Sequence, residues 1–367
     1  MTPVLMPGAR RPRPAVVRGE NQSSASGIVG PVRWLLARRN RPVLVGLAFV
    51  VAGLSPLVVG GLGWETVSFQ VTVFAATSLG WNLLGGYGGQ ISFSYAVYFA
   101  AGAYGAGVSV TSFHASPWVG IGAGVAIACL IALITGLPLF RLRTHYYSIA
   151  TLAILEVTSL VVSAASPLGA SGGLEIPITP YGLGSLEFSP LNATPFFELG
   201  LGLLGVTLLG VWWILRTRTG LYLRAIRDDP VAAEAFGIRT TWWKAVAAVV
   251  SCIPAPVAGG LYAMAALFVD PNTVLSIPFS VLIVLVAVLG GLGTLWGPVV
   301  GAALVITLQQ NLALDLPGQA SGLEPVIYGI VIILVGMFFS QGILAARPIV
   351  ATALRRAGAR VKGVRPW

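Results

Sequence analysis

The sequence contains very little charge. Of its 367 residues, only 9% are Asp, Glu, Lys or Arg, whereas 56% are hydrophobic, and the mean hydropathy is +0.86. A water-soluble domain carries roughly 25% charged residues. This deficit excludes a surface that faces water on all sides, and the apolar runs are long and continuous where a β-barrel strand would alternate. The chain is therefore expected to be an all-α integral membrane protein.

Lysine is also scarce, since only Lys244 and Lys362 occur in the chain. Neither follows a Gly-x-x-x-x-Gly-Lys-Ser/Thr loop, the motif that cradles nucleotide phosphates. We therefore expect no nucleotide and no other cofactor to be bound by this chain. If ATP drives its activity, ATP and Mg must be bound by separate subunits.

Groups that could carry out catalysis or hold a metal are few and scattered. The 12 carboxylates are too dispersed for a catalytic pair, so no catalytic residue is assigned and no enzyme is expected. His114 and His145 each lack a second ligand nearby, so no metal site is predicted. Cys129 and Cys252 lie within apolar runs, and we interpret them as small buried residues, not as a disulfide or metal pair.

The basic residues are clustered. The net charge is +10, and all 22 Lys and Arg lie in four segments: residues 10–41, 141–143, 216–244 and 347–365. The positive-inside rule places all four on the cytoplasmic side, so both termini should be cytoplasmic. This distribution argues for orientation in a membrane and against nucleic acid as a partner. Most acidic residues lie in or beside gaps that lack a basic residue, and those gaps should face outside.

The four basic segments fix the parity of the spans between them, because each interval must cross the bilayer an even number of times. The apolar runs expected to cross are residues 42–63, 66–84, 91–113, 117–140, 146–165, 196–215, 245–268, 279–290, 297–314 and 325–346. The sequence thus predicts a bundle of about ten transmembrane helices, or eight if two Gly-interrupted or short segments are re-entrant. Those two segments are 91–113 and 279–290.

The domain organisation follows from these runs. Residues 1–41 are predicted to form a basic, disordered cytoplasmic arm, and residues 347–367 a basic cytoplasmic tail. Residues 42–346 form the transmembrane domain, which rests in the lipid bilayer. Within it, 166–195 is an external loop and 216–244 is the largest internal loop.

A short helix with two defined ends is predicted in the internal loop. Asp229 is a good N-cap and Pro230 suits the first helical position. Residues 231–236 are helix-compatible, and Gly237 is a natural terminator. A helix of about two turns is marginal in isolation. It is either a small projection that docks in a cleft of a partner or an ordinary inter-span loop.

Two similar glycine clusters suggest a transport path. Residues 84–89 (Leu-Gly-Gly-Tyr-Gly-Gly) resemble residues 289–294 (Leu-Gly-Gly-Leu-Gly-Thr), and each follows a hydrophobic span. Broken helices of this type expose backbone groups to a cavity, although small residues also allow close helix packing. The residues that we assign to a translocation path are Asn82, Gly85, Gly86, Gly88, Gly89, Gln90, Ser92, Thr151, Glu156, Gly290, Gly291 and Gly293.

Glu156 lies within the apolar run 146–165. A carboxylate at membrane depth costs about 2.5 kcal/mol or more on insertion scales, so it should face the bundle interior or a wet cavity. It is a gate, a proton relay or a hydrogen-bonded packing residue.

The internal loop also resembles a known family. Residues 232–238, Ala-Ala-Glu-Ala-Phe-Gly-Ile, resemble the EAA loop of ATP-binding-cassette (ABC) importer permeases, and Arg-Ala-Ile-Arg-Asp-Asp-Pro at 224–230 is similar to LivM-type permeases of branched-chain amino acid importers. Further similar stretches are 82–92, 141–143, 150–156 and 290–298. The chain departs from the family pattern at Ser94-Tyr95 and Thr144-His145, which leaves the substrate open.

This resemblance implies the permease subunit of a bacterial importer in the cell (inner) membrane. Its partners would be two ABC ATPase subunits, a second homologous permease and an extracytoplasmic solute-binding protein that delivers a small amino acid, a branched-chain one by family. Asp229 and Pro230 would begin the coupling helix, Ala232, Ala233 and Glu234 would contact the ATPase, and Gly237 would end it. The alternatives are a proton-coupled secondary transporter that uses Glu156 and a passive channel for urea-like solutes.

Overall fold

The computed structural model describes residues 62–140, 144–177, 193–315 and 329. The chain divides into two units, residues 1–51 and 52–367, and all described residues belong to the second. The predicted arm, tail and first and last spans lie outside the described residues, apart from residues 62, 63 and 329. Their predicted structure is therefore not tested.

Helices account for nearly all of the described part. The α-helices are α3 (Leu62–Asn82), α4 (Tyr95–Thr111), α5 (Pro117–Leu139), α6 (Thr144–Ala164), α7 (Ala193–Arg216), α8 (Arg218–Asp228), α9 (Pro230–Ala235), α10 (Thr240–Cys252), α11 (Pro254–Ala266), α12 (Pro271–Val274), α13 (Ile277–Gly291) and α14 (Gly297–Asp315). A π-helix, η2 (Leu83–Tyr87), continues α3, and two 3₁₀ turns, η3 (Ser166–Leu168) and η4 (Ala170–Gly172), follow α6. The all-α prediction is confirmed.

Five segments in the described residues are long and apolar enough to cross a membrane. They are Gly63–Tyr87, Pro117–Leu139, His145–Ala164, Thr194–Arg216 and Thr240–Ala266. The predicted total of about ten spans is not confirmed by this number. The last segment begins five residues earlier than predicted and contains α10 and α11, which are separated at Ile253 because Pro254 has no N–H for the helical ladder.

Two predicted spans are short helices. α4 has 17 residues and begins at Tyr95, because residues 88–94 run as an irregular segment before it. α13 has 15 residues, about 22 Å at 1.5 Å per residue, against a hydrocarbon core of about 30 Å. These are the two segments for which the sequence left a re-entrant arrangement open.

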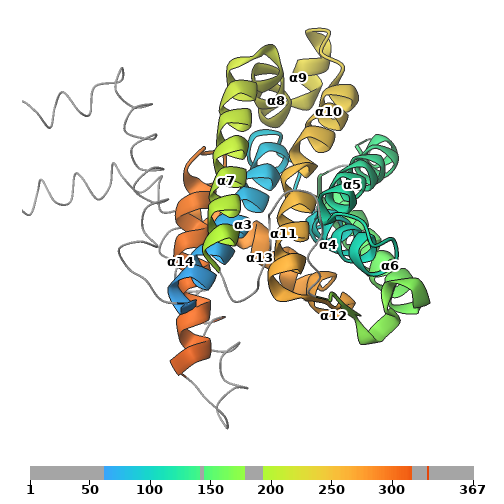
Figure 1. Ribbon diagram of the computed structural model, residues 1–367. Helices are drawn as coiled ribbons and strands as arrows, with labels where there is room; N and C mark the ends of the chain where they lie inside the picture. The colour runs from blue at the N-terminus through green and yellow to red at the C-terminus, as the bar shows by residue number, and fades with distance from the viewer. Residues whose placement is uncertain (1–61, 141–143, 178–192, 316–328, 330–367) are drawn as a thin grey trace, which may run out of the picture. The chain divides into compact units, whose positions relative to one another are not determined.

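The core is built around α4, whose side chains are almost all buried. The Phe99 ring packs against Phe279 and Tyr262, with ring centroids 4.9 and 5.6 Å apart. Glycines permit the close crossing of α4 and α11, because a Cβ on Gly102 or Gly259 would overlap the backbone of the other helix. α4 is thereby fixed between α5 and α11 (Figure 1).

One small antiparallel ladder interrupts the helices. β1 (Leu174–Glu175) pairs with β2 (Phe268–Val269), so that Leu174 opposes Val269. The ladder lies near α12, whereas α8 and α9 lie at the opposite end of the bundle (Figure 1). We refer to the latter as the α8–α9 end.

Candidate functional site

The helix predicted after Asp229 is present as α9, and its first turn is capped as expected. One carboxylate oxygen of Asp229 accepts the N–H groups of Val231 at 2.8 Å and Ala232 at 3.0 Å. Pro230 occupies the first helical position, where its missing N–H costs nothing. The predicted start of the helix is therefore confirmed.

The end of α9 forms a Schellman motif. Gly237 has φ +83°, and its N–H donates to the Glu234 carbonyl at 2.9 Å. The Ile238 N–H donates to the Ala233 carbonyl at 3.1 Å. These are the paired bonds by which a left-handed glycine closes a helix, so the predicted end at Gly237 is confirmed as well.

The exposed face of α9 differs from the predicted contact set. Ala233 is 3% exposed and turns into the chain, whereas Val231 and Phe236 are 76% and 86% exposed. Ala232 is exposed, as is Glu234, whose carboxylate accepts the Thr240 hydroxyl at 2.5 Å. Ala233 is thus unsuited to touch a partner, because its side chain is buried against the chain itself. Val231, which we did not assign, belongs to it.

α8 is an element that the sequence reasoning missed. Its buried residues Gly220, Leu223 and Ile226 repeat every third position, a spacing that predicts one helical face against the bundle. The Asp229 N–H donates to the Ala225 carbonyl at 3.1 Å, so Asp229 both ends α8 and caps α9. The two helices are consequently joined without an intervening loop.

The two glycine clusters meet in space. The Asn82 carboxamide is fully buried, donates to the Thr294 carbonyl at 2.8 Å and accepts the Gly293 N–H at 2.9 Å. A Cβ on Gly86 would lie 2.7 Å from the Gly293 nitrogen. We call residues 82–89 and 290–294 the glycine junction. It unites turns that are 212 residues apart through one side chain.

Arg227 connects α8 to the glycine junction. Its guanidinium Nη1 donates to the Gly86 carbonyl at 2.5 Å. The same nitrogen would lie 2.8 Å from a Cβ on Gly293, so the guanidinium sits between the two turns. One turn earlier in α8, the Arg224 guanidinium lies 5.7 Å from the ring centroid of Tyr87. The α8–α9 end and the junction therefore form one connected structure.

Apart from Gly86, which packs on Asn82, the assigned glycines fall into two groups. Gly89 and Gly293 have φ near +70° and Gly291 has φ +133°, which L side chains rarely adopt. Gly85 packs on the Trp81 ring, Gly88 on the Leu84 carbonyl and Gly290 on the backbone of α14. Gly85, Gly88 and Gly290 thus fit the alternative that these glycines allow close helix packing. Gly89, Gly291 and Gly293 provide the backbone conformations that the turns require.

The irregular segment after the junction is held by side chains. The Trp81 indole donates to the Ser92 carbonyl at 2.7 Å, and the Thr151 hydroxyl accepts the Phe93 N–H at 3.0 Å. Ser92 and Ser94 hydroxyls bond each other at 2.8 Å. The first two bonds satisfy backbone groups that water cannot reach at membrane depth. Thr151 thus ties α6 to the segment, whereas the Ser92 hydroxyl bonds within it.

Gln90 and Glu156 are the other assigned polar residues. Gln90 is buried, and its Oε1 has no hydrogen-bond partner among the described residues. Glu156 does not face the interior of this chain as expected, because its side chain is exposed. α6 buries Tyr147, Thr151 and Leu155, which repeat every fourth position, and Glu156 lies off that stripe.

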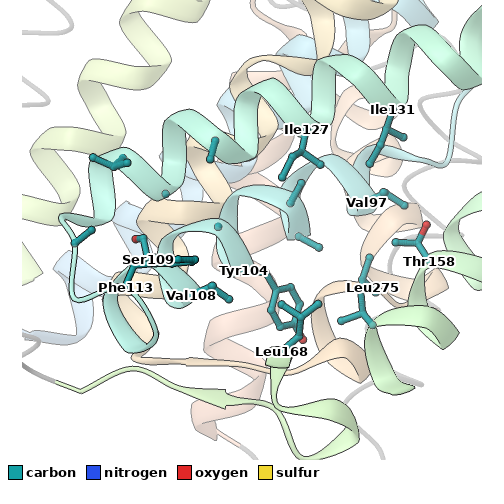
Figure 2. Close-up of a pocket in the computed structure, with 18 residues that line it drawn as sticks. Val97, Tyr104, Val108, Ser109, Phe113, Ile127, Ile131, Thr158, Leu168 and Leu275 are labelled. Atoms are coloured by element: carbon teal, nitrogen blue, oxygen red, sulfur yellow. The ribbon is translucent and has the colours of Figure 1, made fainter. Parts of the chain in front are cut away.

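A cavity of about 510 Å³ lies between α4, α5 and α6. Figure 2 shows that Val97, Ile127, Leu168 and Leu275 line it, with the Tyr104 side chain between them. No charged residue is among its lining residues in the described part, and none of the assigned path residues lines it. The cavity suits aliphatic groups, and its described lining offers hydroxyl groups but no charge to pair with an ammonium or a carboxylate.

A second cavity of about 500 Å³ lies beside α7, α10 and α11. Glu198 is the charged residue among its described lining, and Thr207 and Ser251 also contribute. The Ser251 hydroxyl accepts from Tyr95 at 2.7 Å, so it is already engaged. Its described lining thus offers one carboxylate but no cation.

The cysteines lie closer than the sequence suggested. Cys129 and Cys252 are free, as expected, but their sulfur atoms are 3.8 Å apart. Sequence reasoning could not pair them because they are 123 positions apart. Among the described residues there is no group of three or more His, Cys, Asp or Glu that could hold a metal.

Comparison with known families matches most of this chain. The sequence model described as "Branched-chain amino acid transport system / permease component" matches residues 63–336. That range contains the glycine junction, α8 and α9. No solved structure matches the chain.

Curated relatives agree with that match. The chain is 24% identical over 319 residues to the "High-affinity branched-chain amino acid transport system permease protein LivM" of Escherichia coli, covering 81% of this chain and 74% of the relative. It is 23% identical to the protein with the same description in Salmonella typhimurium, covering 68% and 63%. A "Probable branched-chain amino acid transport permease protein LivM" of Methanocaldococcus jannaschii is 22% identical, covering 68% and 76%.

Proposed function

The chain belongs to the branched-chain amino acid transport permease family, and on this premise we propose that it is the membrane subunit of an ABC importer. Separate ATPase subunits bind ATP and Mg and drive uptake of a small amino acid, a branched-chain one by analogy with LivM. A second homologous permease completes the path, and an external binding protein delivers the substrate.

The observation that carries the proposal is α9. A six-residue helix is too short to be stable alone, yet both of its ends are fixed by backbone and side-chain bonds. It presents Val231 and Phe236 almost fully to the outside. Large apolar groups at a rigid projection are typical of a docking surface.

The charge distribution supports the orientation. The segment 216–244, which contains α8 and α9, holds six of the 22 basic residues. We infer that the α8–α9 end faces the cytoplasm, where an ATPase is available. The plasma membrane is then the proposed location.

The cavities bear on substrate recognition. A free amino acid carries one positive and one negative charge, and both need partners when they leave water. Neither described cavity supplies both signs. We therefore propose that zwitterion recognition occurs mainly in the external binding protein and that the path is shared with the second permease.

Capture of ATPase subunits tests the proposal. The tagged full-length chain is co-expressed with candidate ABC ATPases and purified in lipid nanodiscs as wild type, Phe236→Ser and Phe113→Ser. The two Phe residues are 86% and 75% exposed, and they lie near opposite ends of the bundle. We expect Phe236→Ser alone to reduce ATPase capture.

Two results would contradict the proposal. If the wild type captures no ATPase and its uptake stops when a proton ionophore collapses the gradient, the chain is a proton-coupled transporter. Downhill flux of urea through the purified chain alone would favour a passive channel. Uptake that requires ATP and survives the ionophore supports the importer.

A further inference from the structure

We propose that Arg227 is the positioning residue through which movement of α9 reaches the glycine junction. This inference rests on the proposed function, because it concerns how ATPase binding at α9 is passed to the membrane helices. The guanidinium of Arg227 bridges the last turn of α8 and the Gly86 carbonyl at 2.5 Å.

The first link is the stiff connection between α9 and α8. Asp229 donates its N–H to Ala225 in α8 and accepts two N–H groups of α9 with its carboxylate. Since one residue serves both helices with no loop between them, we expect a movement of α9 to displace the last turn of α8. Arg227 lies in that turn.

The second link is the fit of α8 on the junction. Leu223 is fully buried, and a Cβ on Gly88 would lie 3.6 Å from its Cδ2 atom. A Cβ on Gly89 would lie 3.2 Å from Cγ of Arg227, so the stem of this side chain rests on the turn. Apolar packing thus positions the guanidinium at its acceptor.

The third link is polar and reaches both turns. A hydrogen bond from a guanidinium is stronger than one between neutral groups. The Arg227 guanidinium holds Gly86 in the first turn, and the Asn82 carboxamide holds Gly293 and Thr294 in the second. A displacement of Arg227 would therefore act on both turns at once.

The junction is an element that can change conformation. η2 is a π-helix, a form that is rare and frequently found at functional sites. Gly89 and Gly293 have positive φ, and glycine absorbs large backbone rotations at little steric cost. Movement transmitted here would alter the ends of α3 and α13, which flank the turns.

Hydrogen exchange on the full chain in lipid nanodiscs tests the physical link without any partner. The variants are Arg227→Gln, Arg227→Lys and the control Arg218→Gln, which removes the same charge from the exposed start of α8. We expect Arg227→Gln to speed amide exchange in residues 83–90 and 291–294 about tenfold, the factor for losing one bond to a charged donor. Arg227→Lys should recover part of the protection, and Arg218→Gln should match the wild type.

Coupled transport tests the role. In proteoliposomes with the captured ATPases, we expect Arg227→Gln to bind ATPase and hydrolyse ATP while leucine uptake per ATP falls about tenfold or more. Equal losses of ATPase binding, hydrolysis and uptake would mean a folding role only and would overturn the inference. So would exchange and uptake equal to those of Arg218→Gln.

The proposed function can fail separately. A wild type that captures no ATPase refutes the importer and the transmitting role together. A wild type with ATP-dependent uptake whose ratio of uptake to ATP is unchanged in Arg227→Gln refutes only this inference. Faster amide exchange in Arg227→Gln together with an unchanged leucine uptake per ATP also counts against the transmitting role of Arg227.

Discussion

Replacing Asp229 by Ala should weaken α9 without altering its exposed apolar face. The substitution removes the carboxylate that accepts the N–H groups of Val231 and Ala232 at 2.8 and 3.0 Å. The backbone N–H of residue 229 remains, so the bond that ends α8 at Ala225 is kept. The loss is therefore confined to the first turn of α9.

The expected loss of ATPase affinity follows from the free energy that the Asp229 N-cap contributes. Loss of an N-cap of this type costs about 1 kcal/mol, a factor of about 5 in a local equilibrium. α9 has six residues, and a helix of this length has few other backbone bonds to absorb the loss. Since a partner binds only the folded fraction, apparent affinity for the ATPase should fall by up to about fivefold.

The assay compares Asp229→Ala with Asp228→Ala and Asp229→Asn by titrating the purified ATPase onto the chain in nanodiscs. Asp228→Ala removes the same charge at the adjacent exposed position, where no capping bond is formed. Asn also caps helices well. Equal weakening by Asp228→Ala and Asp229→Ala, or weakening by Asp229→Asn as large as by Ala, would refute the capping argument in favour of a charge effect.

Two further outcomes are expected. Gly237→Ala should destabilise α9 by about 1 kcal/mol, because Gly237 has φ +83° and a Cβ there would meet no atom within 4 Å, so the cost is conformational alone. Proteolysis within residues 229–238 should therefore accelerate, and an unchanged cleavage rate would contradict this prediction. Oxidation with diamide should convert the Cys129 and Cys252 thiols, 3.8 Å apart, into one disulfide with reduction of the diamide. Maleimide labelling is done after denaturation, because Cys252 is fully buried; it should fall from two thiols to none in the wild type, whereas Cys252→Ser should keep its single thiol, and retention of both wild-type thiols would refute the pairing.

The sequence by itself determined the features that depend on composition or on neighbouring residues. The charge deficit required membrane helices, because a water-facing surface needs more polar groups. The two ends of α9 were predictable because Asp229, Pro230 and Gly237 act on groups within three or four residues of themselves. The family also followed from a local pattern, residues 224–238.

Some sequence patterns indicated a feature of the structure without specifying its contacts. The similarity of the two glycine clusters was visible in the sequence, but nothing in it indicated that Asn82 joins them. α8 was missed although its buried residues repeat every third position, because the segment 216–244 is rich in charge. The inward position of Ala233 depends on which face of α9 meets the chain.

Only the tertiary structure decided the contacts between distant segments. Arg227 reaches Gly86 across 141 positions, and the two cysteines meet across 123. Such contacts leave no local pattern, because many partners of similar size and polarity would satisfy the same spacing. The orientation of Glu156 was decided in the same way, by the stripe of α6 that packs on the chain. The sequence thus specified α9, and the fold connected it to the glycine junction.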